Sequence, residues 1–253
     1  LTGLKPTYGL VSRSGVSPHS PSMDHVGPMG RDIQTVIAMT HAIAGPDPRD
    51  PTSFKSAGAA WKEHPSRLRI GFDPSYCIDG VATEIREALT RAIASFEELN
   101  FQIVEVQFPS PDAILEDYPS YAGIEMAAAH RTTFAAHKDQ YGTALRRLIE
   151  RGLSVSSTDF HEMIMRRADY SGHLTRFFQN IDIFLTPTAS YAAPTLSQMA
   201  AFDANPEDLR RLINYSVPFN MTGLPTLVLP CGQTSEGHPF TMQLVGPKFS
   251  EDR

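Results

Sequence analysis

The segment from Arg67 to Phe108 constrains the fold more than any other part of the sequence, because it combines two strand patterns with a helix pattern. Arg67–Phe72 (RLRIGF) is a short strand candidate, and Phe101–Phe108 (FQIVEVQF) alternates between apolar and polar residues as a strand does. Between them, Val81–Leu99 has an amphipathic helix pattern with Val81, Ile85, Leu89, Ile93 and Phe96 on one face. A strand, a helix and a strand in about forty residues predict a right-handed crossover and a parallel strand pair.

Two further regions have helical patterns. Arg31–Ala44 is predicted to be a helix that ends at Gly45, after which a proline-rich connection continues to Ser66. Tyr121–Phe178 is predicted to be helical with polar joints, and Ser156–Asp159 (SSTD) supplies an N-cap for the helix that follows it. Helices therefore both precede and follow the strand–helix–strand unit.

The remaining strand candidates lie in the second half of the chain. Ile181–Leu185 (IDIFL) reads as a buried strand, and Thr226–Pro230 and Phe240–Val245 are two strands that a polar link joins into a hairpin. Parallel strands joined by a helix, together with a terminal hairpin, predict an α/β fold with a mixed β-sheet covered by helices on both faces. We expect residues 1–253 to form a single domain.

Composition excludes several classes of function. The net charge of −6 argues against nucleic acid as the main partner, because phosphate binding needs a basic surface. No apolar run has the length of a membrane span, and the cysteines Cys77 and Cys231 stand without a CxxC motif or a nearby histidine ladder. These features predict a cytoplasmic protein without a membrane segment, a disulfide framework or a structural metal site.

The residues alone indicate no cofactor and no catalytic constellation. His161–Met165 (HEMIM) begins like a zincin helix but has Met165 in place of the second histidine, and no Walker loop or GxGxxG motif is present. A Ser-Lys pair needs a lysine that its surroundings keep neutral, and none of the five lysines stands where burial is obvious. Three arginine pairs are most simply solvated helix faces: Arg146-Arg147, Arg166-Arg167 and Arg210-Arg211.

The opening stretch from Gly3 to Met29 (GLKPTYGLVSRSGVSPHSPSMDHVGPM) is rich in Gly, Pro and Ser and reads as an active-site loop. In its DHVGP segment, Gly27 and Pro28 make a tight turn, and the Asp24 carboxylate can accept backbone N–H groups around that turn. Asn220 in the PFN segment can bridge backbone groups in the same way. We therefore interpret Asp24 and Asn220 as architectural rather than catalytic residues.

Five ordered blocks together resemble the amidase signature family of serine amidohydrolases. They are GLKPTYGLVSRSGVSP with SMDHVGPM, AIAGPDPRDPTS, DIFLTPT, PFNMTGLPTLVLPCG and GHPFTMQLVGPKF. They reach both ends of the chain, whereas the helices between Tyr121 and Phe178 fit the family only loosely. The resemblance implies the amidase signature fold, here incomplete.

The resemblance also implies a mechanism. The family uses a serine nucleophile, a second serine in a cis peptide and a lysine base, and it hydrolyses a carboxamide to an acid and ammonia or an amine. All of these residues precede the block that corresponds to GLKPT, so no catalytic residue is assigned within residues 1–253. The chain is expected to be the C-terminal part of an amidase and to be inactive alone.

The predicted substrate pocket lies beside that missing segment. Glycine-proline turns bring the backbone close to a ligand, so Ser22–Pro28 and Phe219–Pro225 are predicted to face one cleft near Leu1. The residues assigned to the pocket are Met23, Asp24, Phe219 and Asn220. The expected partner is a small-molecule amide, with no cofactor, no metal, no nucleic acid and no membrane. The sequence leaves open whether the protein forms a homodimer.

Two alternatives remain at the level of sequence. The A subunit of glutamyl-tRNA(Gln) amidotransferase is similar at GLKPTYG and PCG, but it usually has Asp-Gln where Asp24-His25 stands here. It also usually has an acid at the position that aligns with Ile213. The other alternative is a non-catalytic binding or scaffold module derived from an amidase.

Overall fold

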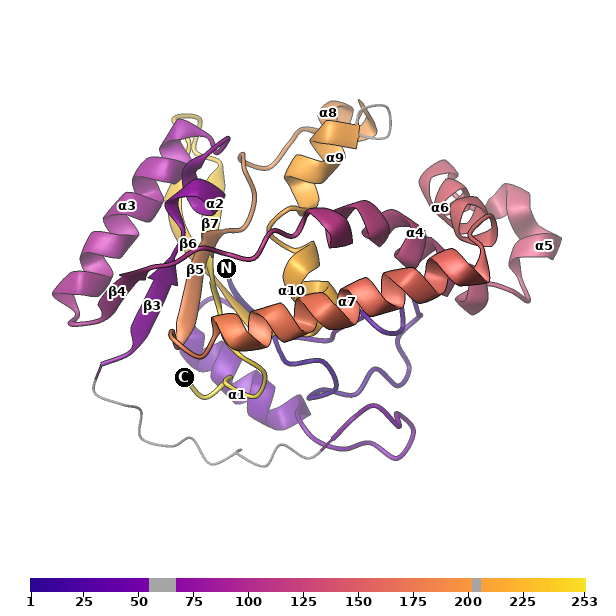
Figure 1. The fold of residues 1–253 in the computed structure, drawn as a ribbon, viewed down its shortest axis with the longest axis horizontal. Coiled ribbons are helices and arrows are strands. Elements are labelled where there is room, and N and C mark those ends of the chain that lie inside the picture. The colour runs from indigo at the N-terminus through magenta and orange to yellow at the C-terminus, as the bar shows by residue number, and fades with distance from the viewer. Residues whose placement is uncertain (55–66, 202–205) are drawn as a thin grey trace.

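The computed structural model describes residues 1–54, 67–201 and 206–253, so most of the predicted connection before Ser66 lies outside the described residues. The described residues contain a seven-stranded sheet in the order β2-β1-β6-β7-β5-β3-β4 (Figure 1). Its strands are β1 (Thr2–Lys5), β2 (Met29–Gly30), β3 (Arg69–Phe72), β4 (Gln102–Glu105), β5 (Ile183–Pro187), β6 (Thr226–Gln233) and β7 (Pro239–Val245).

The sheet is mixed, as the sequence predicts. Strand β3 runs parallel to β4, with Ile70 opposite Ile103, and parallel to β5, with Ile70 opposite Ile183. The other neighbouring strands are antiparallel, including the predicted hairpin of β6 and β7, whose register shifts between Pro230 and Gly232. Both the parallel pair and the hairpin are therefore confirmed.

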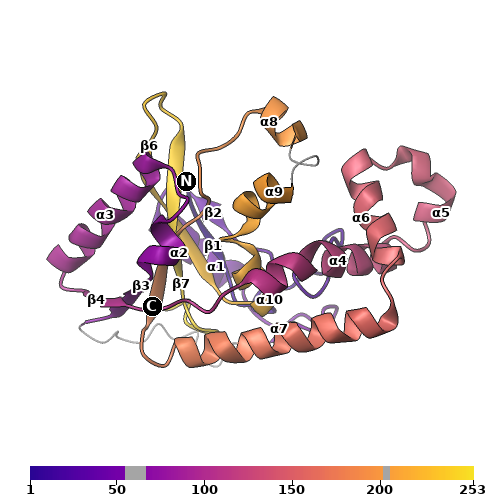
Figure 2. The ribbon, with the colours of Figure 1, turned by 45° about the horizontal axis from the view of Figure 1, so that its top comes forward.

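Helices lie on both sides of the sheet. Figures 1 and 2 both show α3 on one side and α4, α7 and α10 on the other. The helices are α1 (Ile33–Ile43), α2 (Pro74–Ile78), α3 (Thr83–Glu98), α4 (Asp112–Ala129), α5 (Phe134–His137), α6 (Thr143–Leu153), α7 (Ser157–Phe177), α8 (Leu196–Ala201), α9 (Pro206–Ile213), α10 (Val217–Thr222) and the 3₁₀ turn η1 (Lys138–Gln140). The predicted α/β architecture with helices on both faces is confirmed.

Short polar side chains set where three helices begin. Asp32 caps α1 by accepting a hydrogen bond from the backbone N–H of Thr35, and Ser156 caps α7 by accepting one from Asp159. The Ser156 cap is the one predicted from sequence. Asp73 caps α2 through the N–H groups of Ser75 and Tyr76, and it also accepts a hydrogen bond from the N–H of Phe108 at 2.6 Å. Asp73 thus joins the end of β3 to the segment that follows β4.

The opening stretch differs from the predicted loop, because it contributes two strands. Strand β1 pairs with β6, with Gly3 opposite Val228, and with β2, with Gly3 opposite Met29. Neither strand has apolar alternation, and each becomes a strand only through a partner far away in the sequence. Helix α10 was also not predicted, and it ends at Gly223, whose φ of +68° suits glycine.

An aromatic cluster fills the core on the side of the sheet that α7 and α10 cover. Phe184 of β5 is fully buried and stacks on Phe108 with ring centroids 4.8 Å apart. Phe177 of α7 meets the Phe184 ring edge-on at 5.1 Å, and the Phe219 ring of α10 lies 5.9 Å from that of Phe108. This cluster fixes α10, and with it the segment predicted to line the pocket.

The last turns of α4 pack against α6 in a part of the structure that extends away from the sheet (Figure 2). A small second core of Met126, Phe134 and Ile149 joins them to α5. At their crossing, Gly123 meets Gly152 so closely that a β-carbon built on Gly152 would lie 2.1 Å from the carbonyl carbon and oxygen of Gly123. The two backbones therefore touch directly.

Candidate active site

The predicted pocket segments meet at a polar junction, which we define as residues 19–25 with their partners on α4, α7 and α10. Asp24 closes the turn at its start: its carboxylate accepts hydrogen bonds from the backbone N–H groups of His19 and Ser20, both at 3.0 Å. Asp24 thus binds backbone N–H groups, although those groups precede it and do not belong to the predicted Gly27-Pro28 turn. Its role in a substrate pocket stays a prediction.

Glu125 of α4 holds the same turn from the other side. One of its carboxylate oxygens accepts hydrogen bonds from the Ser20 hydroxyl and from the Ser22 backbone N–H, both at 3.0 Å. Glu125 lies one helical turn after Tyr121, so the two residues share a face of α4 that looks toward the junction. The turn is therefore attached to α4 by a charged acceptor.

Arg167 of α7 lies at the centre of the junction. Its guanidinium donates to the Ser22 carbonyl oxygen at 2.8 Å, the Ser22 hydroxyl at 2.6 Å and the Tyr121 hydroxyl at 2.8 Å. Its Nε donates to the carbonyl oxygen of Met221 in α10. The prediction that this arginine lies on a solvated helix face is wrong, because the side chain points into the protein.

The other arginine pairs differ from the predicted solvated faces in part. Arg166 makes a bidentate ion pair with Asp117 of α4, and Asp117 is only 8% exposed. Arg210 pairs with Asp112 at the start of α4, and Arg211 lies over the ring of Tyr191. Arginine side chains therefore fasten α7 and α9 to their neighbours.

Lys5 contradicts the expectation that no lysine is desolvated. Its ammonium group points inward from β1 and donates to the carbonyl oxygens of Phe219, at 3.3 Å, and Leu224. Burial lowers the pKa of Lys5 to about 7, and the charge of Glu251 offsets part of that effect. Lys5 thus ties the first strand to both ends of the Phe219–Leu224 segment.

His25 lies beside Lys5 with one ring nitrogen satisfied. Its Nδ1 is 2.6 Å from the carbonyl oxygen of Met23, which makes Nδ1 the protonated nitrogen of the neutral ring. Its Nε2 is buried and has no hydrogen-bond partner among the described residues. Burial, followed by the positive charges of Lys5, Arg13 and Arg167, lowers the pKa of His25 to about 3, although the bond to Met23 opposes this.

This environment makes stability depend on pH. The unfolded chain protonates His25 near its ordinary pKa of 6.5, whereas the folded chain keeps it neutral down to about 3. The contribution of His25 is therefore complete above 6.5 and is lost as the pH falls. Relative to His25→Gln, we expect wild type to lose about 2 kcal/mol of unfolding free energy between pH 7 and pH 5. Urea denaturation at the two pH values measures this, and parallel losses in both proteins would contradict it.

The four residues assigned to the pocket occupy different environments. Met23 and Phe219 are buried in the core, at 2% and 0% exposure. Asn220 is half-buried, and among the described residues its hydrogen bonds are those of its backbone within and after α10, so the bridging role predicted for its side chain is not observed. Sequence reasoning did not single out Tyr118 of α4. Burial raises the pKa of its hydroxyl, and the charge of the nearby Asp24 raises it further.

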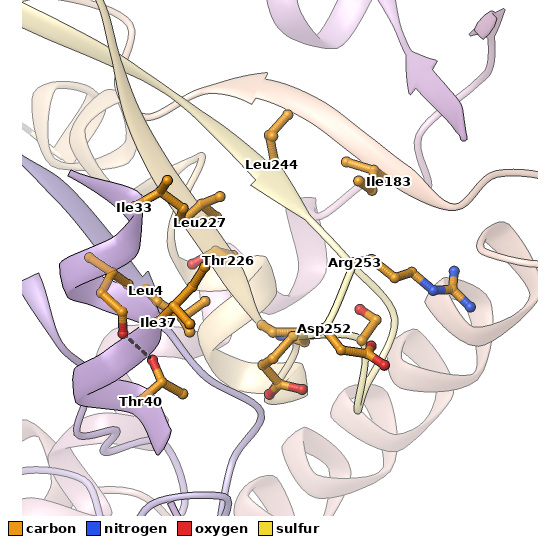
Figure 3. Close-up of a pocket in the computed structure, with 15 residues that line it drawn as sticks. Leu4, Ile33, Ile37, Thr40, Ile183, Thr226, Leu227, Leu244, Asp252 and Arg253 are labelled. Carbon is orange, nitrogen blue, oxygen red and sulfur yellow. Dashed lines mark hydrogen bonds between the residues drawn. The ribbon is translucent and has the colours of Figure 1, made fainter. Parts of the chain in front are cut away.

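Two cavities of the described residues each include residues of only one of the two predicted segments. An apolar cavity of about 270 Å³ lies between α1, the sheet and the last residues of the chain, where Ile33 and Ile37 face Leu227 (Figure 3). It includes Pro225 but no residue of the Ser22–Pro28 segment. A smaller surface cavity of about 170 Å³ includes Asp24 but no residue of the Phe219–Pro225 segment. The two segments are joined by the hydrogen bonds of Arg167 to Ser22 and Met221.

The arrangement is suited to holding two loops rigidly rather than to attacking a bond. Ser20 donates to a carboxylate, and Ser22 accepts from a guanidinium, so neither hydroxyl is bonded to a lysine or histidine base. The described residues contain no group of three or more His, Cys, Asp or Glu side chains that could hold a metal ion. Within the same residues, no helix combines the length and apolarity required to cross a membrane.

One sequence signal could have identified Arg167. The buried residues of α7 are Met163, Tyr170 and Leu174, and Arg167 lies four residues after the first and three before the second. This spacing places the arginine on the apolar face of the helix and not on the opposite one. Lys5 has no comparable signal, because its partners are more than 200 residues away.

The mixed sheet with its flanking helices defines an α/β protein. Its candidate site is built from loops that are held against the faces of helices. A family model described as Amidase matches residues 1–253. The chain therefore belongs to the amidase family, as its sequence blocks indicated.

Individual relatives agree with this assignment. The chain is 30% identical over 257 residues to the putative amidase AmiD of Mycobacterium tuberculosis, a match that covers 99% of this chain and 53% of AmiD. It is 30% identical over 279 residues to the glutamyl-tRNA(Gln) amidotransferase A subunit of Symbiobacterium thermophilum, covering 99% of this chain and 56% of that relative. The chain thus spans about half the length of the curated relatives it matches.

A solved structure described as a crystal structure of amidase has the same fold. It superposes with a TM-score of 0.81 at 25% identity, over 99% of this chain and 55% of that structure's chain. The mixed sheet and its helices are therefore those of an amidase.

Proposed function

We propose that residues 1–253 form the C-terminal part of an amidase that hydrolyses a small carboxamide to a carboxylic acid and ammonia or an amine. The observation that carries the proposal is the match of the whole chain to the amidase family, together with relatives about twice as long. Under this proposal, the junction around Arg167 is the wall of a substrate pocket, and the reacting groups come from residues encoded before Leu1.

The chemistry follows from those expected groups. A serine hydroxyl, deprotonated through a second serine by a lysine, attacks the amide carbonyl carbon, and the amine leaves with a proton. Water then hydrolyses the resulting ester and releases the acid. The described serines at the junction are already engaged by Glu125 and Arg167, which is consistent with a nucleophile elsewhere.

The test compares residues 1–253 with the intact protein, meaning the product that also contains the residues encoded before Leu1. A fluorophosphonate probe, which labels activated serines, should label the intact protein at one serine, and that protein should release ammonia or amine from simple carboxamides. Residues 1–253 alone should show neither labelling nor turnover. A labelled serine within residues 1–253, with amide turnover, would contradict the proposal.

A second candidate is the A subunit of glutamyl-tRNA(Gln) amidotransferase, which the 30% identity to the Symbiobacterium protein supports. Ile213, which aligns with the acid usual in that protein, is apolar and packs against the core. This observation favours a general amidase. Glutamine hydrolysis that requires further subunits, without hydrolysis of simple amides, would favour the amidotransferase instead, and an intact protein that binds partners but hydrolyses neither would indicate a scaffold.

A further inference from the structure

We infer that Arg167 is the positioning residue that holds the two walls of the substrate pocket, Ser20–His25 and Phe219–Leu224, in one fixed geometry. This inference rests on the proposed function, because it gives the two segments a substrate to hold. Arg167 touches neither a reacting group nor a catalytic serine among the described residues. It acts through the segments that it joins.

The first argument is the distribution of its hydrogen bonds. The Ser22 hydroxyl and carbonyl oxygen bind one edge of the guanidinium, while the Met221 carbonyl binds Nε. One planar group therefore contacts the backbone of both walls, which are about 200 residues apart in sequence. The rigid fork of guanidinium donors fixes the direction to each of these acceptors, whereas a lysine ammonium presents its donors from a single point.

The second argument is how the guanidinium itself is held. The Tyr121 hydroxyl accepts a hydrogen bond from it, and the Tyr121 ring lies under its central carbon at 5.0 Å. Tyr121 is 5% exposed, so it forms a fixed platform in α4. None of the ion pairs found in the described part of the chain involves Arg167. Its donors are thus directed at neutral acceptors, which fits a role in geometry rather than in charge neutralisation.

The consequence for the reaction is a defined effect on substrate binding. When the walls are no longer held, the amide has to order them as it binds, and this cost weakens substrate binding. Since the walls are proposed to bind the amide while the reacting groups lie elsewhere, the loss should fall on KM more than on kcat.

The neighbouring arginine supplies a matched control. Arg166 lies on the same helix and binds the buried Asp117, but it has no hydrogen bond to either wall. Arg166→Met should therefore destabilise the intact protein without moving the pocket. Arg167→Met should both destabilise the protein and disorganise the walls.

The experiment measures kcat, KM and the melting temperature of the intact protein with a simple carboxamide. For Arg167→Met we expect KM to rise about tenfold, with kcat per folded molecule changed by less than about threefold. Arg167→Lys should recover only part of this loss, and Ser22→Ala, which removes one acceptor, should give a smaller rise in KM. Arg166→Met should lower the melting temperature and leave KM unchanged.

Hydrogen exchange of the backbone amides in the two walls separates this inference from the proposed function. Arg167→Met should speed exchange in both Ser20–His25 and Phe219–Leu224, whereas Arg166→Met should speed it in neither. If wild type turns over no amide, the proposed function fails, and the exchange result alone decides whether Arg167 joins the walls. An unchanged KM in Arg167→Met, or faster exchange in one wall only, would overturn the inference.

Discussion

Replacing Gly152 with alanine is expected to lower the free energy of unfolding by about 3 kcal/mol, near the upper end of the range for overpacked sites. A β-carbon at this position would lie 2.1 Å from the Gly123 carbonyl and 2.4 Å from the Ile124 nitrogen. Both are backbone atoms of α4, so no side chain can rotate away to make room. The helices α4 and α6 would have to separate, and the small core of Met126, Phe134 and Ile149 would open with them.

Gly172→Ala is the control for this substitution. Gly172 also lies within a helix, but its nearest neighbour is the flexible end of Arg176, at 3.7 Å. Alanine there should leave stability unchanged or raise it by up to about 1 kcal/mol, because alanine favours the helix. Urea denaturation of both variants measures the contrast. Equal stability of Gly152→Ala and wild type would mean that α4 and α6 do not touch as closely as described.

Replacing Asp73 with alanine is expected to cost about 3 kcal/mol, because this carboxylate performs two functions at a buried site. It caps α2 through the N–H groups of Ser75 and Tyr76, and it accepts the buried N–H of Phe108. Asp73 is only 4% exposed, so its hydrogen bonds are far less accessible to water than those of an exposed cap. The variant would lose the cap and leave the Phe108 N–H unsatisfied beneath the aromatic cluster.

Asp32→Ala tests whether burial is the reason for the large loss of stability expected at Asp73. Asp32 caps α1 in the same way, through the N–H of Thr35, but it is exposed, so water can take over its hydrogen bond. The loss on substituting Asp32 should therefore be clearly smaller than the loss at Asp73. Thermal melts of the two variants under the same conditions give the comparison, and equal losses would show that capping alone accounts for the effect at Asp73.

The parts of the fold that the sequence predicted are those with local signals. The β3–α3–β4 unit has its full pattern within one continuous segment, and the N-cap at Ser156 is a contact over three residues. Strands β1 and β2 could not be predicted in this way. Gly3 and Lys5 interrupt any apolar alternation in β1, and what makes it a strand is its pairing with β6.

The residues of the candidate site likewise fall into those with local partners and those whose partners are distant in sequence. That the Asp24 carboxylate binds backbone N–H groups could be predicted because its partners are only four and five residues away, although they precede it and do not surround the Gly27-Pro28 turn. Lys5 and Arg167 could not be predicted from their immediate neighbours, because their surroundings are assembled from distant segments. The helical spacing of Met163 and Tyr170 did indicate that Arg167 lies on the buried face of its helix. Treating Arg166 and Arg167 together as a solvated pair led to the wrong prediction.

The pairing of β1 with β6 also determines the order in which the molecule can form. Gly3 cannot meet Val228, nor Thr7 the Glu251 side chain, until those later residues have emerged from the ribosome. During synthesis β1 remains without β6, while local units such as β3–α3–β4 can already assemble. Closing so long a loop is entropically costly, and folds rich in such distant pairings fold slowly. Completion of the sheet is thus a late event, and the Phe219–Leu224 wall gains its anchor at Lys5 only then.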